Sequence, residues 1–269
     1  MEHRGLDTYG YFEREGSLGQ VQTAFRPVVA AARERIGDAY GRRLHSAYLY
    51  GSVPRGTARP GRSDLDLLIA LHHEPGGEDR DTTEALARGL DEEFPEIDGV
   101  GVLLYGKDRL LSEQERYDLG WFLAVLCTPL LGADLAEHLP RYRPDSLLAR
   151  ETNGDLAELL PGVRERIRAA ATPEDYRKLC RGVSRHLVRT GFTLVMPRWG
   201  GWTSDLTESA EVFGQYYPER AEQMRAAAAA ALDPVADPAV LRAYVEDLGP
   251  WLADEYTARH GAKTPRPAG

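Results

Sequence analysis

The pattern of apolar and polar positions divides the chain into two parts, and the first part predicts a small sheet with helices. Three short apolar runs of strand length lie at residues 46–50, 64–71 and 100–105. Apolar residues at helical spacing predict helices over residues 21–36 and 81–94. The run after Asp66 is almost unbroken, which indicates a strand buried on both faces.

The pattern changes after about Arg109, and no clear strand is predicted beyond it. Helical spacing of apolar residues predicts helices at residues 113–131, 145–160, 173–191, 204–213, 218–232 and 238–260. The expected fold class is therefore α+β. An N-terminal α/β domain with a small mixed sheet is expected over residues 1–110, and an all-helical bundle domain over residues 111–269.

The composition narrows the class of protein. Apolar residues make up 42% of the 269, which is enough for a buried core. No run of about eighteen apolar residues occurs, so no membrane span is expected. The mixed charges of the first residues do not resemble a secretory signal. Two distant cysteines predict neither a disulfide framework nor a zinc site, so we expect a cytoplasmic protein.

The net charge of −9 bears on the partners of this protein. A broad interface with a nucleic-acid backbone needs clustered lysine and arginine, so such a partner is not expected. An acidic cleft would instead attract a cationic small molecule.

The candidate chemistry lies between two of the predicted strands. The first strand runs into Gly51-Ser52, where a turn is expected to open a short helix that reaches Gly56. The next strand begins Ser63-Asp64-Leu65-Asp66, and residues two apart in a strand point to the same face. Two adjacent carboxylates repel each other unless a cation lies between them. Carboxylates together with the phosphates of a substrate suit Mg²⁺, so this region predicts a site for a metal and a nucleotide.

This motif, Gly-Ser-x-x-x-Gly followed by Ser-Asp-x-Asp and an apolar run, resembles the nucleotidyltransferase superfamily typified by DNA polymerase β. The resemblance implies transfer of a nucleoside monophosphate from a nucleoside triphosphate, with two Mg²⁺ ions held by Asp64 and Asp66. The nucleotide would contact residues of the motif, namely Gly51, Ser52, Arg55 and Ser63. A turn cap is the alternative role for Ser63, and a solvated surface arginine is the alternative for Arg55.

The resemblance also implies a third carboxylate beside the next strand, which binds metal or accepts the proton of the attacking hydroxyl. Residues 100–105 contain no acid, and Gly99 and Gly101 stand where one could be expected. Asp98 directly precedes this strand and is our candidate for both the catalytic and the metal-binding role. An aspartate that caps a loop is the alternative.

The order of the two halves resembles the bacterial aminoglycoside adenylyltransferases that modify streptomycin and spectinomycin. The segment Leu130 to Leu135, followed by Leu139-Pro140, resembles the connection between the halves in that family. The family has a phosphate-binding lysine in the helical half, and Arg198 is the nearest substitute here. Arg198 precedes Trp199 and Trp202 in an expected glycine-rich loop, which could close over a nucleotide or pack between helices.

The resulting hypothesis is an enzyme that transfers AMP from ATP to a hydroxyl of a small molecule, with an aminoglycoside-like antibiotic as one candidate acceptor. The helical half would help to bind the substrate and close over the nucleotide. We expect a cationic acceptor between the halves, attracted by acidic residues that could line a cleft there: Glu113, Glu115, Asp118, Glu151 and Asp155. The alternatives are nucleotidyl transfer to a tRNA or a protein, as in toxin–antitoxin modules, and an inactive nucleotide-binding protein.

Overall fold

The computed structural model describes residues 4–266, which form two compact units. The first unit comprises residues 13–141. The second comprises residues 142–266 together with the segment 4–12. Each unit has its own core and is described separately.

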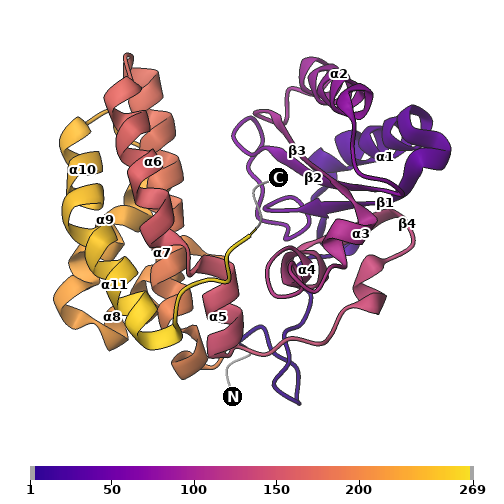
Figure 1. Cartoon of the computed structure of the whole chain (residues 1–269). Helices are drawn as coiled ribbons and strands as arrows, with labels where there is room; N and C mark the ends of the chain where they lie inside the picture. The colour runs from indigo at the N-terminus through magenta and orange to yellow at the C-terminus, as the bar shows by residue number, and fades with distance from the viewer. Residues whose placement is uncertain (1–3, 267–269) are drawn as a thin grey trace. The chain divides into compact units, whose positions relative to one another are not determined.

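The first unit is built on a four-stranded mixed sheet with the strand order β3-β2-β1-β4 (Figure 1). Its strands are β1 (Leu44–Tyr50), β2 (Leu65–Leu71), β3 (Val100–Gly106) and β4 (Thr128–Gly132). β1 pairs antiparallel with both β2 and β4. β2 and β3 are parallel, and α2 (Gly77–Glu93) provides the crossover that a parallel pair needs. The expected fold class and the three expected strands are confirmed.

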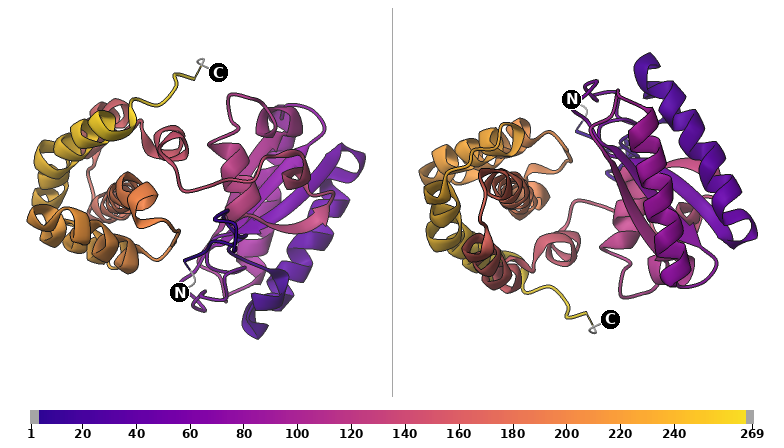
Figure 2. Two further views of the ribbon diagram at one scale, coloured as in Figure 1. Left: turned by 90° about the horizontal axis from the view of Figure 1, so that it is seen from below. Right: turned by 90° about the horizontal axis from the view of Figure 1, so that it is seen from above.

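The sheet is covered on both faces, as the continuous apolar run of β2 predicts. On one face, Leu67 and Ile69 pack in a cluster with residues of α1 (Arg26–Tyr40) and α2 (Figure 2). On the other face, Leu68 and Ala70 pack with Leu123 and other residues of the segment after β3. Two short 3₁₀ turns, η1 (Leu18–Gln20) and η2 (Thr23–Phe25), precede α1.

The expected helix over residues 113–131 is wrong. After α3 (Lys107–Leu110) the chain forms turns, the short α4 (Leu119–Trp121) and a π-helical segment, η4 (Phe122–Leu126). It then enters β4, and η5 (Leu135–His138) follows. Pro129 cannot continue a helix, but it fits β4 because this strand lies at the edge of the sheet. Pairing with β1 therefore overrides the helical spacing.

The limits of the first unit differ from the boundary that the sequence suggested after residue 110. Residues 111–141 belong to this unit because β4 completes the sheet and Leu123 and Leu135 are part of its core. At the other end, the segment 4–12 belongs with the helices. Trp202 N donates to Arg4 O at 2.8 Å, and Phe12 N donates to Tyr142 O at 2.9 Å.

The second unit is helical and is organised around α7 (Pro173–Trp199), which lies inside a ring of other helices (Figure 2). The others are α5 (Ser146–Asn153), α6 (Leu156–Ala169), α8 (Leu206–Tyr216), η6 (Pro218–Arg220), α9 (Ala221–Leu232), α10 (Pro238–Ala243), η7 (Tyr244–Leu248) and α11 (Gly249–His260). Among the described residues, no helix combines the length and apolar character that a membrane crossing requires.

The expected end of this helix at Gly191 is wrong, because α7 extends to Trp199. Residues 192–196 are fully buried, and the helix continues through them to Trp199, where Gly200 caps it in the left-handed conformation with φ of 70°. Gly191 lies close to Met224 of α9, and a Cβ at this position would meet the Met224 side chain. A glycine that seemed to end the helix therefore allows two helices to approach closely.

Candidate functional site

The candidate site lies where one strand ends and two others begin. β1 ends beside the start of β2, and Tyr50 pairs with Asp66. Asp66 also pairs with Gly101 of β3. Asp64 directly precedes β2, and Leu65 N donates to Gly99 O at 2.9 Å. The sheet thus brings the aspartate motif next to the turn after β1 and the start of β3.

Glycines on both sides leave room for the half-buried Asp66 carboxylate. A Cβ on Gly51 would overlap Asp66 Oδ2, and one on Gly101 would lie 3.0 Å from Asp66 Oδ1. Gly51 also has φ of 79°, which favours glycine. On Gly99, a Cβ would lie 3.8 Å from Asp64 Oδ1. Larger residues at these positions would occupy the space around the two carboxylates.

Two carboxylates two residues apart, flanked by glycines and not by larger side chains, fit Mg²⁺, because one or two carboxylates can share this ion with substrate phosphates. They do not make a complete cage. Within residues 4–266, no three histidine, cysteine, aspartate or glutamate side chains are grouped so that they could hold a metal. The structure therefore places Asp64 beside Gly99 and Asp66 beside Gly101, and it does not group Asp98 with them as a third ligand.

The segment after β1 forms consecutive turns, so the short helix expected there is wrong. Gly56 N donates to Val53 O at 3.2 Å, and Thr57 N donates to Ser52 O at 3.1 Å. Gly56 has φ of 71°, and a Cβ there would lie 2.8 Å from Gln20 O. These contacts hold Gly51 and Ser52 in a tight turn beside Asp66.

The other residues of the motif have partners within the first unit. Arg55 forms an ion pair with Glu15 at 3.4 Å, and both side chains are partly exposed. Ser63 Oγ accepts a hydrogen bond from Arg59 N at 2.9 Å, so the hydroxyl caps the loop before β2 as the alternative role predicts.

Asp98 is exposed and lies next to the motif along the sheet edge. Its N–H donates to Ser63 O at 3.1 Å. Gly99 follows with φ of 130°, which interrupts the regular alternation of side chains at the start of β3. The strand register therefore does not by itself assign the Asp98 side chain to one face.

Residues that the sequence did not mark as part of the site cover the sheet face on which Tyr50, Leu68 and Ala70 pack. Tyr50 and Phe122 meet edge to face with ring centroids 5.1 Å apart. Cys127 is buried, and burial raises the pKa of its thiol well above the ordinary value. Arg14 pairs with Asp134 at 2.8 Å. The positions of Phe122 and Cys127 could not be predicted, because the segment 113–131 has the apolar spacing of a helix.

The residues expected to close over a nucleotide contact aromatic rings of the helical unit. Arg198 lies in the last turn of α7, with its guanidinium 4.6 Å from the ring centroid of Tyr216 and 5.3 Å from that of Tyr217. Trp199 and Trp202 both meet Phe192 edge to face, at 5.7 and 5.5 Å. The expected glycine-rich loop is therefore partly helix, and its tryptophans take part in aromatic packing.

The acidic residues expected to attract the acceptor have basic partners in several cases. Glu113 pairs with Arg116, and Asp155 pairs with Lys263 at 3.0 Å. A carboxylate whose charge is balanced by a basic partner attracts a cationic ligand less strongly.

Glu151 is the most strongly paired of these acids. It is buried and contacts Arg150 at 2.9 Å and Arg266 at 3.3 Å. Burial alone would raise the pKa of Glu151, but hydrogen bonds from Thr264 and Arg150 outweigh it and lower this pKa.

Comparison with known proteins defines the class of this fold and site. Residues 31–118 match the model of the nucleotidyltransferase domain family, and this range contains the Gly51–Asp66 motif. These residues therefore form a nucleotidyltransferase domain, in agreement with the resemblance of the motif to the DNA polymerase β type. No match was found among curated proteins.

The particular likeness is to an antibiotic-modifying enzyme. The structure is similar to that of the spectinomycin adenyltransferase AAD(9) from Enterococcus faecialis, solved with ATP and spectinomycin. The TM-score is 0.55 and the identity 13%, over 86% of this chain and 98% of the other. At this identity the likeness establishes the fold, which resembles that of the aminoglycoside adenylyltransferases.

Proposed function

We propose that this protein transfers AMP from ATP to a hydroxyl of a small cationic molecule in an Mg²⁺-dependent reaction. The observation that carries the proposal is the placement of Asp64 and Asp66 beside the Gly51 turn, with glycines that keep the surrounding space open. This arrangement occurs within the matched nucleotidyltransferase domain.

Each residue of the site has a role in this proposal. Asp64 and Asp66 would hold Mg²⁺, which neutralises the triphosphate and stabilises charge during in-line displacement. The Gly51 N–H and the Ser52 hydroxyl would bind phosphate oxygens. The acceptor oxygen forms a bond to the α-phosphorus as the bond to the pyrophosphate oxygen breaks. Asp98 accepts the proton of the acceptor hydroxyl, and pyrophosphate leaves.

The class of acceptor rests on charge and on the fold. A net charge of −9 favours a cationic molecule through long-range attraction. The structurally similar enzyme AAD(9) was solved with ATP and spectinomycin. That structure supports ATP as the co-substrate, and an aminoglycoside-like antibiotic as the first acceptor to test.

One observation favours a second candidate, a protein that binds nucleotides without transferring them. Gly99 precedes β3 and Gly101 is its second residue, and the described residues contain no group of three metal-binding side chains. A site with only two carboxylates would bind Mg²⁺ and a nucleotide but would lack a base near the acceptor.

Product analysis separates the two candidates. The protein is incubated with Mg²⁺, labelled nucleoside triphosphates and a panel of aminoglycosides and other hydroxyl compounds, and the products are identified by mass spectrometry. The transferase predicts an acceptor heavier by one AMP, together with released pyrophosphate. Both products should disappear in Asp64→Asn and Asp66→Asn, because each loses a metal-binding charge. Asp91→Asn, at an exposed aspartate of α2, is the matched control.

Nucleotide binding without any transfer across the panel would favour the second candidate. Full transfer by both aspartate variants would contradict the site itself, whichever acceptor is used.

A further inference from the structure

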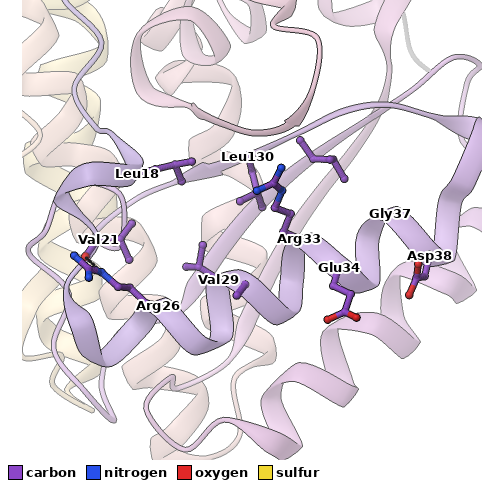
Figure 3. A pocket seen from close by; sticks show the side chains of 11 residues that line it. Leu18, Val21, Arg26, Val29, Arg33, Glu34, Gly37, Asp38 and Leu130 are labelled. Carbon is purple, nitrogen blue, oxygen red and sulfur yellow. Dashed lines mark hydrogen bonds between the residues drawn. The ribbon is translucent and has the colours of Figure 1, made fainter.

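A groove in the first unit lies away from the aspartate motif, along α1. It has a volume of about 650 Å³ and runs between α1, Leu18 of η1 and the edge strand β4 (Figure 3). Val21, Val29 and the β4 residues Leu130 and Leu131 give it an apolar lining.

The helix side of this groove has an ordered arrangement of charge. Groove-lining residues recur every three or four positions along α1, so they form one stripe. Arg26 and Arg33 lie toward the N-terminal end of the stripe, whereas Glu34 and Asp38 lie toward its C-terminal end. The stripe therefore reverses its sign of charge along the helix.

These charges have little compensation within the chain. Over residues 4–266, the exposed side chains of Arg33, Glu34 and Asp38 take part in no ion pair or hydrogen bond. Arg26 donates only to the carbonyl oxygen of Val21, at 3.3 Å. By contrast, Arg35 on another face of the same helix pairs with Glu93. The groove thus combines an apolar lining with four charges that a partner could compensate.

Small residues make the middle of the stripe accessible. Ala30 and Gly37 lie on either side of Arg33 and Glu34. A Cβ on Gly37 would make an ordinary van der Waals contact with Leu131 Cδ2 at 3.5 Å, and glycine leaves that volume of the groove unfilled. Another helix backbone could therefore approach α1 closely here.

We propose that the groove binds α1 of a second copy of this chain in an antiparallel, two-fold symmetric arrangement. A helix whose charge reverses along its length is complementary to its own antiparallel copy. With the two-fold axis between Arg33 and Glu34, Arg33 faces Glu34 of the partner subunit, and Glu34 faces the partner's Arg33. Ala30 then lies opposite the partner's Gly37, and Asp38 lies near the partner's Arg26.

The charge pattern favours a second copy over a different partner. A uniformly acidic or basic segment would satisfy two of the four charges and repel the other two. Two copies satisfy all four charges on each side and cover the apolar lining of both grooves. The proposal does not depend on the proposed enzymatic function.

Sedimentation equilibrium of the full-length protein, over a wide concentration range at low salt, tests the proposal. The wild type should dimerise. Arg33→Glu and Glu34→Arg should each weaken the dimer by about tenfold or more, because each turns two attractive contacts into repulsive ones. The double variant R33E/E34R exchanges the two charges and should restore the dimer. Arg42→Glu, which removes an exposed arginine outside the groove, should leave it unchanged.

Mixing the two single variants gives the sharpest result. A chain with acids at both positions should pair with a chain with arginines at both positions, so a one-to-one complex should form where neither variant dimerises alone. That recovery also shows that both variants are folded. A wild type that is monomeric at every concentration would overturn the proposal. A dimer insensitive to both single variants would overturn it as well, by placing the interface elsewhere.

Discussion

At the scale of single residues, the Asp66 carboxylate lies between Gly51, which follows β1, and Gly101 of β3. Neither glycine has a side chain that could bind a ligand. Both matter because the space that they leave allows a carboxylate, and a metal beside it, to lie at the sheet edge. Substituting one of them tests the geometry of the site without removing any of its charges.

Gly51→Ala should abolish Mg²⁺-dependent nucleotide binding. Its methyl group would overlap Asp66 Oδ2 and displace the carboxylate. The positive φ adds a backbone cost of about 1–2 kcal/mol. Isothermal titration with Mg²⁺ and a non-hydrolysable ATP analogue measures the binding.

Gly61→Ala is the matched control, because Gly61 has φ of 69° but nothing within 4 Å of an added Cβ. The Gly61→Ala variant should lose a similar amount of folding stability through its backbone strain, but it should still bind the nucleotide. Equal binding by both variants would contradict the role of Gly51 in keeping space for Asp66.

Asp98→Asn should lower turnover while leaving the affinity for nucleotide nearly unchanged. A positioned base contributes about 10²–10⁴-fold to the rate, and the amide cannot accept the proton. Single-turnover kinetics and nucleotide titration measure the two effects separately. Glu96→Gln, two residues earlier, is the control. Loss of nucleotide binding with unchanged turnover would instead make Asp98 a binding or structural residue.

At the scale of secondary-structure elements, Asp79 connects the start of α2 with the chain after α1. Its buried carboxylate accepts a hydrogen bond from Gly76 N at 2.9 Å, which satisfies a free donor at the helix start. The same carboxylate pairs with Arg43 at 2.6 Å and contacts His73 Nε2 at 3.1 Å. One side chain thus caps a helix and holds two neighbouring segments against it.

Asp79→Asn should lower the free energy of unfolding by about 1–3 kcal/mol at neutral pH, because it leaves Arg43 without its buried partner. The hydrogen bond from Gly76 is the largest of the causes that lower the pKa of Asp79 below its ordinary 3.8. A carboxyl group with a lowered folded-state pKa stabilises the fold above its unfolded-state pKa. The difference between wild type and variant should therefore shrink as the pH falls below about 3.8.

Urea denaturation at several pH values measures this difference. Asp81→Asn, at an exposed position on the same helix, should change the stability little at any pH. A difference between wild type and Asp79→Asn that stays constant down to acidic pH would contradict the assignment of the stabilisation to the ionised carboxylate.

At the scale of the whole molecule, each compact unit combines segments that are distant in the sequence. β4 completes the sheet on the far side of β1, and the segment 4–12 packs with the helices. Phe12 contacts Trp202 edge to face at 6.0 Å, which places an N-terminal residue in the aromatic packing of the helical unit.

The fragment 13–141 should fold alone, whereas the fragment 13–110 should not. The shorter fragment lacks β4, Leu123 and Cys127, so one edge of β1 would be unpaired and the apolar face of β2 uncovered. Thermal unfolding followed by circular dichroism should show a cooperative transition only for the longer fragment. Equally cooperative unfolding of both would show that residues 111–141 are dispensable for this unit.

The sequence by itself determined the strands around the site and the aspartate motif. The apolar run of β2 and the Asp64-x-Asp66 spacing are local features, because the alternation of side chains along a strand follows from backbone geometry alone. The glycine-serine turn and the paired acids could therefore be located, and assigned to a class of enzyme, before the fold was known.

Tertiary structure decided the features that depend on distant partners. Residues 128–132 become β4 because β1 offers backbone hydrogen bonds, which outweigh the small local preference for helix. α7 continues past Gly191 because surrounding helices bury residues 192–196. Glu151 is compensated by Arg266, more than a hundred residues later. None of these partners can be identified from local spacing, since each is brought close only by folding.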